Sequence, residues 1–187
     1  MKSRLLWIIL SAIVVLMLGV AAAACGDDDD EDGNGAPTGD GEPDAEAYYQ
    51  DVDRIQNSLT EQLDAIGEQS EEAFGDPDKA RNSLSAAKSA GESALEDLSA
   101  LEAPSVAATA HANLVTASEE MVAAVEGMIA DLQGVEEGPE FDDFINGVLQ
   151  TDSAYTLAAE TMRDACAGMQ DAYDNSRLQE IVFQCPI

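Results

Sequence analysis

The chain has 187 residues, and its 38 aspartate and glutamate residues outnumber eight lysine and arginine residues, giving a formal net charge of −30. This excess excludes nucleic acid as a partner, because a polyanion is repelled and no basic, aromatic-rich stripe is present to neutralise phosphates. Anionic lipid headgroups are repelled for the same reason. Any attachment to a membrane must therefore come from an apolar segment or a bound lipid.

The first 25 residues combine a short basic start with a long apolar run. Lys2 and Arg4 precede the run from Leu5 to Ala24, which ends in three alanines directly before Cys25. A basic start, an apolar core and small residues before a cleavage point are the features of a signal peptide. This order resembles the bacterial lipoproteins, in which the cysteine after the cleavage site carries the lipid.

The resemblance implies that residues 1–24 are removed as a signal peptide and that Cys25 becomes the lipidated N-terminus. Its lipobox is a variant, because Ala22 stands where the family usually has leucine. An uncleaved N-terminal membrane helix is the alternative, since 20 residues at 1.5 Å each reach about 30 Å, the thickness of the hydrocarbon core. Both interpretations place the rest of the chain on the extracytoplasmic face of the cell membrane, because the basic residues precede the apolar run.

Residues 25–43 read as an acidic tether. They hold eight acidic residues, no basic residue and no large apolar side chain, so they cannot bury enough surface to offset the entropy cost of ordering, and we expect disorder. Alternate residues from Asp28 to Asp32, followed by Gly33, match the first half of an EF-hand loop. The twelfth position, which needs a glutamate, is Gly39. We therefore expect only weak, nonspecific binding of divalent cations by the tether.

Residues 44–187 are expected to form one all-α domain, because apolar residues recur every three or four positions almost throughout. A first helix is predicted over residues 44–73, and a fourth is predicted to run without a break from Phe141 to Tyr173. The breaks between the four predicted helices fall at Gly75-Asp76-Pro77, Pro104, Gly134 and Gly138-Pro139. Long helices with such short connections return antiparallel to their neighbours, which predicts an up-down-up-down four-helix bundle.

The two remaining cysteines, Cys166 and Cys185, are predicted to form a disulfide, since pairs of thiols outside the cytoplasm are usually oxidised. In one continuous helix their Cα atoms would lie about 28 Å apart, whereas a disulfide requires roughly 4.4–6.8 Å. The fourth helix must therefore end near Asp174-Asn175-Ser176, and a C-terminal tail must fold back. Closing this loop would add about 3 kcal/mol of stability.

His111 is the single histidine, and it lies on the apolar side of the third predicted helix. Counting back from the helix breaks places Asp97, Asp53 and Met162 at the same level of the bundle. A core histidine facing a methionine resembles the ligand pair of b-type cytochromes, which implies a metal or haem held by His111 and Met162. The alternative is structural, with His111 bonded to Asp97 or to the helix end near Pro104, and it needs no cofactor.

A second pattern consists of a leucine-rich helix end, a proline, a histidine two turns later and an apolar pair, here Leu98, Leu101, Pro104, His111, Leu114 and Val115. It resembles many small secreted or lipid-anchored bacterial helical proteins of unknown function. The resemblance implies a helical bundle and no particular activity.

Enzymatic activity is not expected, because a single histidine would have to serve every nucleophilic site and the two Glu-x-x-His motifs of di-iron bundles are missing. We expect a lipid-anchored protein with a non-catalytic binding or adaptor role, whose partner is an envelope protein or a small ligand. The alternatives are a metal or haem binder using His111 with Met162, and a structural spacer.

Overall fold

The computed structural model describes residues 43–70, 76–148, 150, 153–176 and 178, which contain α-helices and no strand. This confirms the all-α class. The helices are α2 (Ala45–Ser70), α3 (Pro77–Ser99), α4 (Ala108–Asp131), α5 (Pro139–Val148) and α6 (Ala154–Asn175). None of these helices is both long enough and apolar enough to cross a membrane. The predicted signal peptide, tether and tail, with Cys25 and Cys185, lie outside the described residues.

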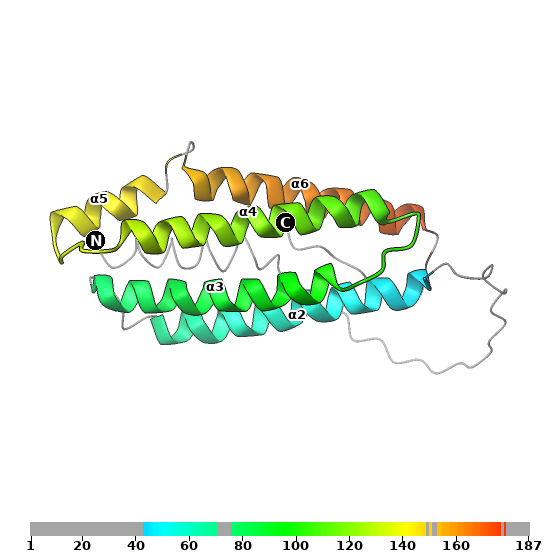
Figure 1. The fold of residues 1–187 in the computed structure, drawn as a ribbon, viewed down its shortest axis with the longest axis horizontal. Coiled ribbons are helices and arrows are strands. Elements are labelled where there is room, and N and C mark those ends of the chain that lie inside the picture. The colour runs from blue at the N-terminus through cyan, green and yellow to red at the C-terminus, as the bar shows by residue number, and fades with distance from the viewer. Residues whose placement is uncertain (1–42, 71–75, 149, 151–152, 177, 179–187) are drawn as a thin grey trace.

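The helices pack side by side in a bundle. Helix α3 packs against both α2 and α4, and α4 packs in turn against α6. Figure 1 shows α2, α3, α4 and α6 extending along the long axis, with α5 beside one end of α4. Each helix buries one apolar stripe, as the repeat of apolar residues predicts.

The buried side chains form two clusters, one toward each end of the bundle. The first, which we call the α5 cluster, joins the beginning of α3, the second half of α4, α5 and the beginning of α6. The second, which we call the tyrosine cluster, joins the beginnings of α2 and α4 to the ends of α3 and α6, and it contains Tyr48, Tyr49 and Tyr173. Met162 packs against both clusters. The middle of the bundle is therefore the boundary between two separate cores.

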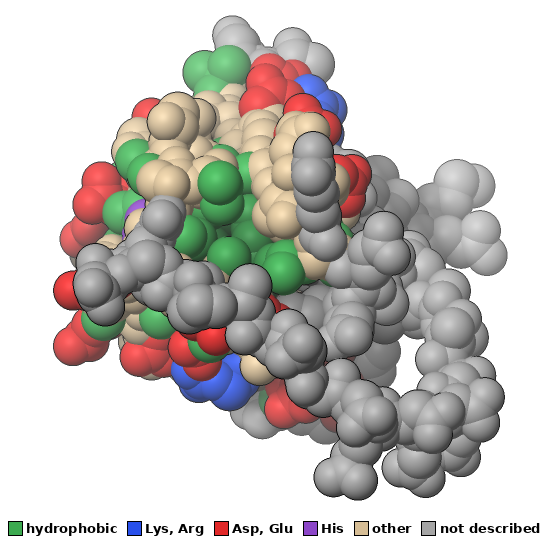
Figure 2. Space-filling view, turned by 90° about the vertical axis from the view of Figure 1, so that its right-hand side faces the viewer, with side chains coloured by type: hydrophobic (Ala, Val, Ile, Leu, Met, Phe, Trp, Pro, Cys, Tyr) green, Lys and Arg blue, Asp and Glu red, His purple; other side chains and the backbone are tan. Residues whose placement is uncertain are grey.

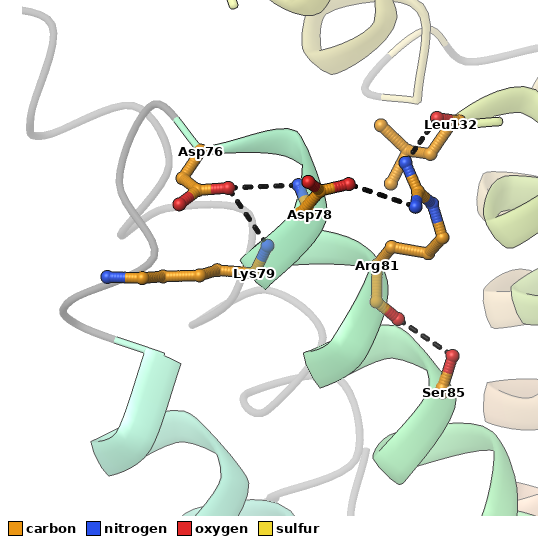
Figure 3. Close-up of polar contacts among 6 residues, drawn as sticks. All are labelled: Asp76, Asp78, Lys79, Arg81, Ser85 and Leu132. Carbon is orange, nitrogen blue, oxygen red and sulfur yellow. Dashed lines mark hydrogen bonds and ion pairs between the residues drawn. The ribbon is translucent and has the colours of Figure 1, made fainter. Parts of the chain in front are cut away.

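The beginning of α3 is fixed by an N-cap at Asp76, within the predicted break between the first two helices. The Asp76 carboxylate accepts hydrogen bonds from the backbone N–H groups of Asp78 and Lys79 at 3.0 and 3.1 Å, and Pro77 occupies the first turn (Figure 3). Arg81 forms an ion pair with Asp78 at 3.0 Å and donates a hydrogen bond to the carbonyl of Leu132 at 3.1 Å. Leu132 is the C-cap of α4, and its carbonyl also accepts from the Val135 N–H at 3.3 Å. The guanidinium is therefore a second donor to a carbonyl at the end of the helix.

The fourth predicted helix is broken, so the prediction of one continuous helix from Phe141 to Tyr173 is wrong. Helix α5 ends at Val148 and α6 begins at Ala154. Ser153 accounts for the break, because its hydroxyl accepts from the Thr156 N–H at 3.1 Å and donates to the Val148 carbonyl at 2.8 Å. A serine that caps the next helix and bonds the end of the previous one favours two helices over one.

Candidate functional site

A cavity of about 80 Å³ lies in the middle of the bundle, where the two clusters meet. All four long helices contribute to its wall. The lining residues are Ile55, Gln56 and Leu59 from α2, Gly91, Ala94, Leu95 and Leu98 from α3, Leu114, Ser118, Met121 and Val122 from α4, and Met162 and Cys166 from α6.

The lining is almost entirely apolar. Its polar groups are the side chains of Gln56 and Ser118 and the sulfur of Cys166. The Ser118 hydroxyl donates to the Leu114 carbonyl in its own helix at 2.8 Å, so its proton is already used. No lysine, arginine, aspartate or glutamate contributes to the wall that the structure describes. The cavity therefore suits uncharged, apolar groups.

Small residues on α3 bring α3 and α4 close together beside the cavity. A Cβ atom on Gly91 would stand 3.2 Å from Cγ2 of Val122, which is tighter than an ordinary van der Waals contact. Because Gly91 and Ala94 offer little side-chain volume, the backbones approach one another while the space in front of them stays empty.

The cavity has a wall that is only partly closed. Over the described residues, α2 and α6 do not pack closely along their lengths, and they meet where the rings of Tyr49 and Tyr173 lie 5.1 Å apart. Leu59 and Met162, which line the cavity from these two helices, are half-buried rather than buried. Among the described residues, the side between α2 and α6 is therefore the least closely packed side of the cavity.

His111 lies outside this cavity, in the tyrosine cluster. Its Nδ1 atom lies 2.9 Å from the hydroxyl of Tyr48, and that hydroxyl also lies 3.9 Å from the sulfur of Met169. The partner of His111 is thus Tyr48 rather than Asp97, which is exposed. Burial lowers the pKa of the imidazole, which favours the neutral ring and lets Nδ1 accept the Tyr48 proton.

Three tyrosine rings follow one another from this histidine, and Tyr48 is the one that contacts it. The rings of Tyr48 and Tyr49 meet edge to face with centroids 5.2 Å apart, and the rings of Tyr48 and His111 lie 5.7 Å apart. Burial raises the pKa of Tyr48 well above its usual range, and the neighbouring Tyr49 adds to the effect. Burial therefore favours the uncharged form of both partners in the Tyr48–His111 hydrogen bond. The sequence places Tyr48 on the buried face of the first helix but contains no motif that pairs it with His111.

The other residues singled out from the sequence separate into two groups. Met162 and Cys166 line the cavity, and Cys166 is only 3% exposed. His111 is not part of this lining, and the methionine beside its hydrogen-bond partner is Met169, two turns of α6 away from Met162. The predicted end of the fourth helix is confirmed, because α6 ends at Asn175. The disulfide stays a prediction, since Cys185 lies outside the described residues.

Histidine, cysteine and acidic side chains are scattered rather than clustered in the part of the chain that the structure describes. No group of three or more histidine, cysteine, aspartate or glutamate side chains there is placed to hold a metal ion. Most acidic side chains are exposed on the outer faces of the helices, and water solvates them there. What the arrangement provides is an empty apolar space with a neutral aromatic cluster at one end of the bundle.

The surface of the bundle carries mostly negative charge. Figure 2 shows one end of the molecule, where hydrophobic side chains occupy the middle and aspartate and glutamate side chains surround them. Four basic residues in the described ranges pair with carboxylates on their own helix: Arg54, Arg81, Lys88 and Arg163. A small anion approaching the cavity would therefore be repelled.

Comparison with known proteins gives no relative for this chain: no protein-family model, no curated protein and no solved structure matches it.

Proposed function

We propose that this chain is a lipid-anchored, non-catalytic binding protein of the cell envelope, which holds a small ligand in the cavity between α2, α3, α4 and α6. In this proposal Cys25 carries the lipid, residues 1–24 are the signal peptide and residues 25–43 link the lipid to the bundle. The membrane is a partner through the lipid, or through an uncleaved N-terminal helix. Nucleic acid is not a partner.

The observation that carries the proposal is the volume of the cavity. Protein cores are normally packed without voids much larger than a water molecule. The cavity of about 80 Å³ leaves the apolar side chains of four helices without packing partners on the side that faces it. An apolar ligand of matching size would supply these contacts on binding.

The proposal includes an up-down-up-down bundle closed by a Cys166–Cys185 disulfide. The composition of the tyrosine cluster supports this topology, because the beginnings of α2 and α4 meet the ends of α3 and α6 there. Cys166 itself stands in the cavity wall, so the proposed disulfide would attach the C-terminal tail to this part of α6.

The experiment is native mass spectrometry of the full chain, purified in mild detergent after exposure to an envelope extract of its bacterial expression host. We compare the unsubstituted chain with Ala94→Leu, which fills the cavity, and with Ala86→Leu, a matched change at an exposed position of the same helix. We expect an added mass in the unsubstituted chain and in Ala86→Leu, and its loss in Ala94→Leu. Identical spectra for all three would contradict the proposal.

The same samples test the lipid anchor and the cofactor alternative. A mass increase by acyl groups that is absent in Cys25→Ser supports lipidation. An absorbance band of haem that disappears in His111→Ala would favour the metal or haem alternative over the cavity. An added mass that is a protein rather than a small molecule would favour the adaptor role.

A further inference from the structure

We propose that the ligand of the cavity is an uncharged alkyl chain. The inference rests on the proposed function and adds the chemical class of the ligand. An alkyl chain has two sources in a cell envelope: a free small hydrocarbon-like molecule, or the acyl chain of a membrane lipid. Both present the same chemistry to the cavity wall.

Charged ligands are excluded by what the wall lacks. A carboxylate or phosphate entering the cavity would lose its water, and no lysine, arginine or histidine contributes to the described lining. An ammonium group would likewise find no aspartate or glutamate there. Because an unpaired charge in an apolar space is strongly unfavourable, the part of the ligand that enters the cavity must be neutral.

Polar neutral ligands such as sugars are disfavoured by the shortage of hydrogen-bonding groups. The Ser118 hydroxyl is committed to the Leu114 carbonyl, and Gln56 supplies the single amide side chain of the lining. A ligand with several hydroxyls would leave most of them without partners, which costs more than the apolar contacts return. The branched side chains and the thioethers of Met121 and Met162 instead offer dispersion contacts and adaptable shape.

The dimensions favour a chain over a compact group. The lining residues run from Gly91 to Leu98 on α3 and from Leu114 to Val122 on α4. At 1.5 Å per residue these stretches extend about 10–12 Å along the helices. The volume of about 80 Å³ is several times the roughly 10–15 Å³ needed by one water molecule. The stretches on α2 and α6, residues 55–59 and 162–166, extend about 6 Å each. A space of this volume between apolar walls accommodates a short alkyl chain.

A route into the cavity is also present. The side between α2 and α6 lacks close helix packing in the described residues, and Leu59 and Met162 line the cavity from its two edges. An alkyl chain can enter between these side chains while any polar headgroup remains in water. This geometry accepts either a free molecule or the end of a longer acyl chain.

The test is photolabelling of the full chain in detergent with a short alkyl diazirine, whose carbene inserts into nearby C–H bonds after loss of N₂. The labelled positions are located by peptide mass spectrometry. A second probe of equal length carries a terminal carboxylate. A third experiment places the chain in phosphatidylcholine vesicles whose lipids carry the diazirine in the acyl chain.

We expect the neutral probe to label peptides that contain the lining of α2, α3 and α4. We expect this labelling to fall at least fivefold in Ala94→Leu and to persist in Ala86→Leu. Labelling from the vesicle lipids would identify acyl chains as the source, and labelling by the short probe alone would identify a free molecule. Either result supports the alkyl class.

Two outcomes overturn the inference in distinguishable ways. If the carboxylate probe labels the lining as strongly as the neutral probe, the cavity binds ligands but the alkyl class is wrong. If the neutral probe labels only exposed apolar positions such as Val106 and Leu157, both the proposed ligand class and the cavity as a binding site are wrong. Because the unsubstituted chain alone gives this second result, it holds even if a substituted chain fails to fold.

Discussion

Two buried tyrosines provide a matched test of the hydrogen bond in the tyrosine cluster. Tyr48 and Tyr155 are 4% and 5% exposed, but Tyr48 bonds His111 at 2.9 Å, whereas the Tyr155 hydroxyl has no hydrogen-bond partner among the described residues. Tyr48→Phe leaves the partly buried Nδ1 of His111 without its Tyr48 partner, so we expect a loss of about 1–2 kcal/mol. Tyr155→Phe removes a hydroxyl that is desolvated without compensation, so we expect no loss and up to about 1 kcal/mol of gain.

The assay is urea unfolding of the full chain, followed by far-ultraviolet circular dichroism, for the unsubstituted chain and both variants at pH 7.5. A double-mutant cycle of Tyr48→Phe with His111→Phe isolates the pairwise interaction, for which we expect about 1 kcal/mol. Equal effects of the two tyrosine substitutions, or a coupling energy of zero within error, would refute the assignment of Tyr48 as the partner of His111.

Three further pairs of measurements follow from the structure. Arg81→Met should cost about 1–2 kcal/mol in urea unfolding, because Arg81 bonds the C-cap carbonyl of α4, whereas Arg54→Met removes only an exposed pair within one helix and should change stability by less than about 0.5 kcal/mol. Gly127→Ala adds a Cβ atom that meets no other atom within 4 Å, so it should stabilise the chain by up to about 1 kcal/mol. Gly91→Ala should stabilise the chain less, because its Cβ atom would stand 3.2 Å from Cγ2 of Val122. Because burial lowers the pKa of His111, the unfolded state takes up the proton first as the pH falls below about 6.5. The stability of the unsubstituted chain relative to His111→Gln should therefore decline between pH 7.5 and pH 5, and parallel pH profiles would contradict this.

The sequence predicts the helical class and most helix ends because those depend on local chemistry. Asp76 and Pro77 mark the beginning of α3 by their own capping geometry. The end of α6 at Asn175 falls where the predicted disulfide called for a break. The break between α5 and α6 was missed because the apolar repeat continues across it. The signal was Ser153, a good N-cap residue in the middle of an apparently continuous pattern.

The partner of His111 could not be predicted by counting residues. The count assumed a sharp turn at Pro104, but the structure has a connection between α3 and α4 that extends from Ala100 to Ala107. Connection residues do not advance along the bundle axis as helical residues do. The histidine therefore meets Tyr48 rather than Asp53, a difference of five residues, or about 7.5 Å along α2. Side-chain reach adds to this difference, since a tyrosine hydroxyl lies far from its own backbone.

The cavity and the tyrosine cluster occupy neighbouring levels of α4 but differ in polarity. The cavity wall is almost entirely apolar, whereas the tyrosine cluster contains the hydrogen bond between Tyr48 and His111. His111 is one turn away from Leu114, which lines the cavity, yet the imidazole is directed to Tyr48 and contributes nothing to the cavity wall. The two core clusters leave space between them where α3 carries Gly91 and Ala94, so the cavity follows from small side chains and not from the polar pair. Substitutions of His111 should consequently change stability and its pH dependence while leaving alkyl labelling of the cavity intact. Loss of that labelling in His111→Gln, in a chain that is still folded, would mean that the two features form one site.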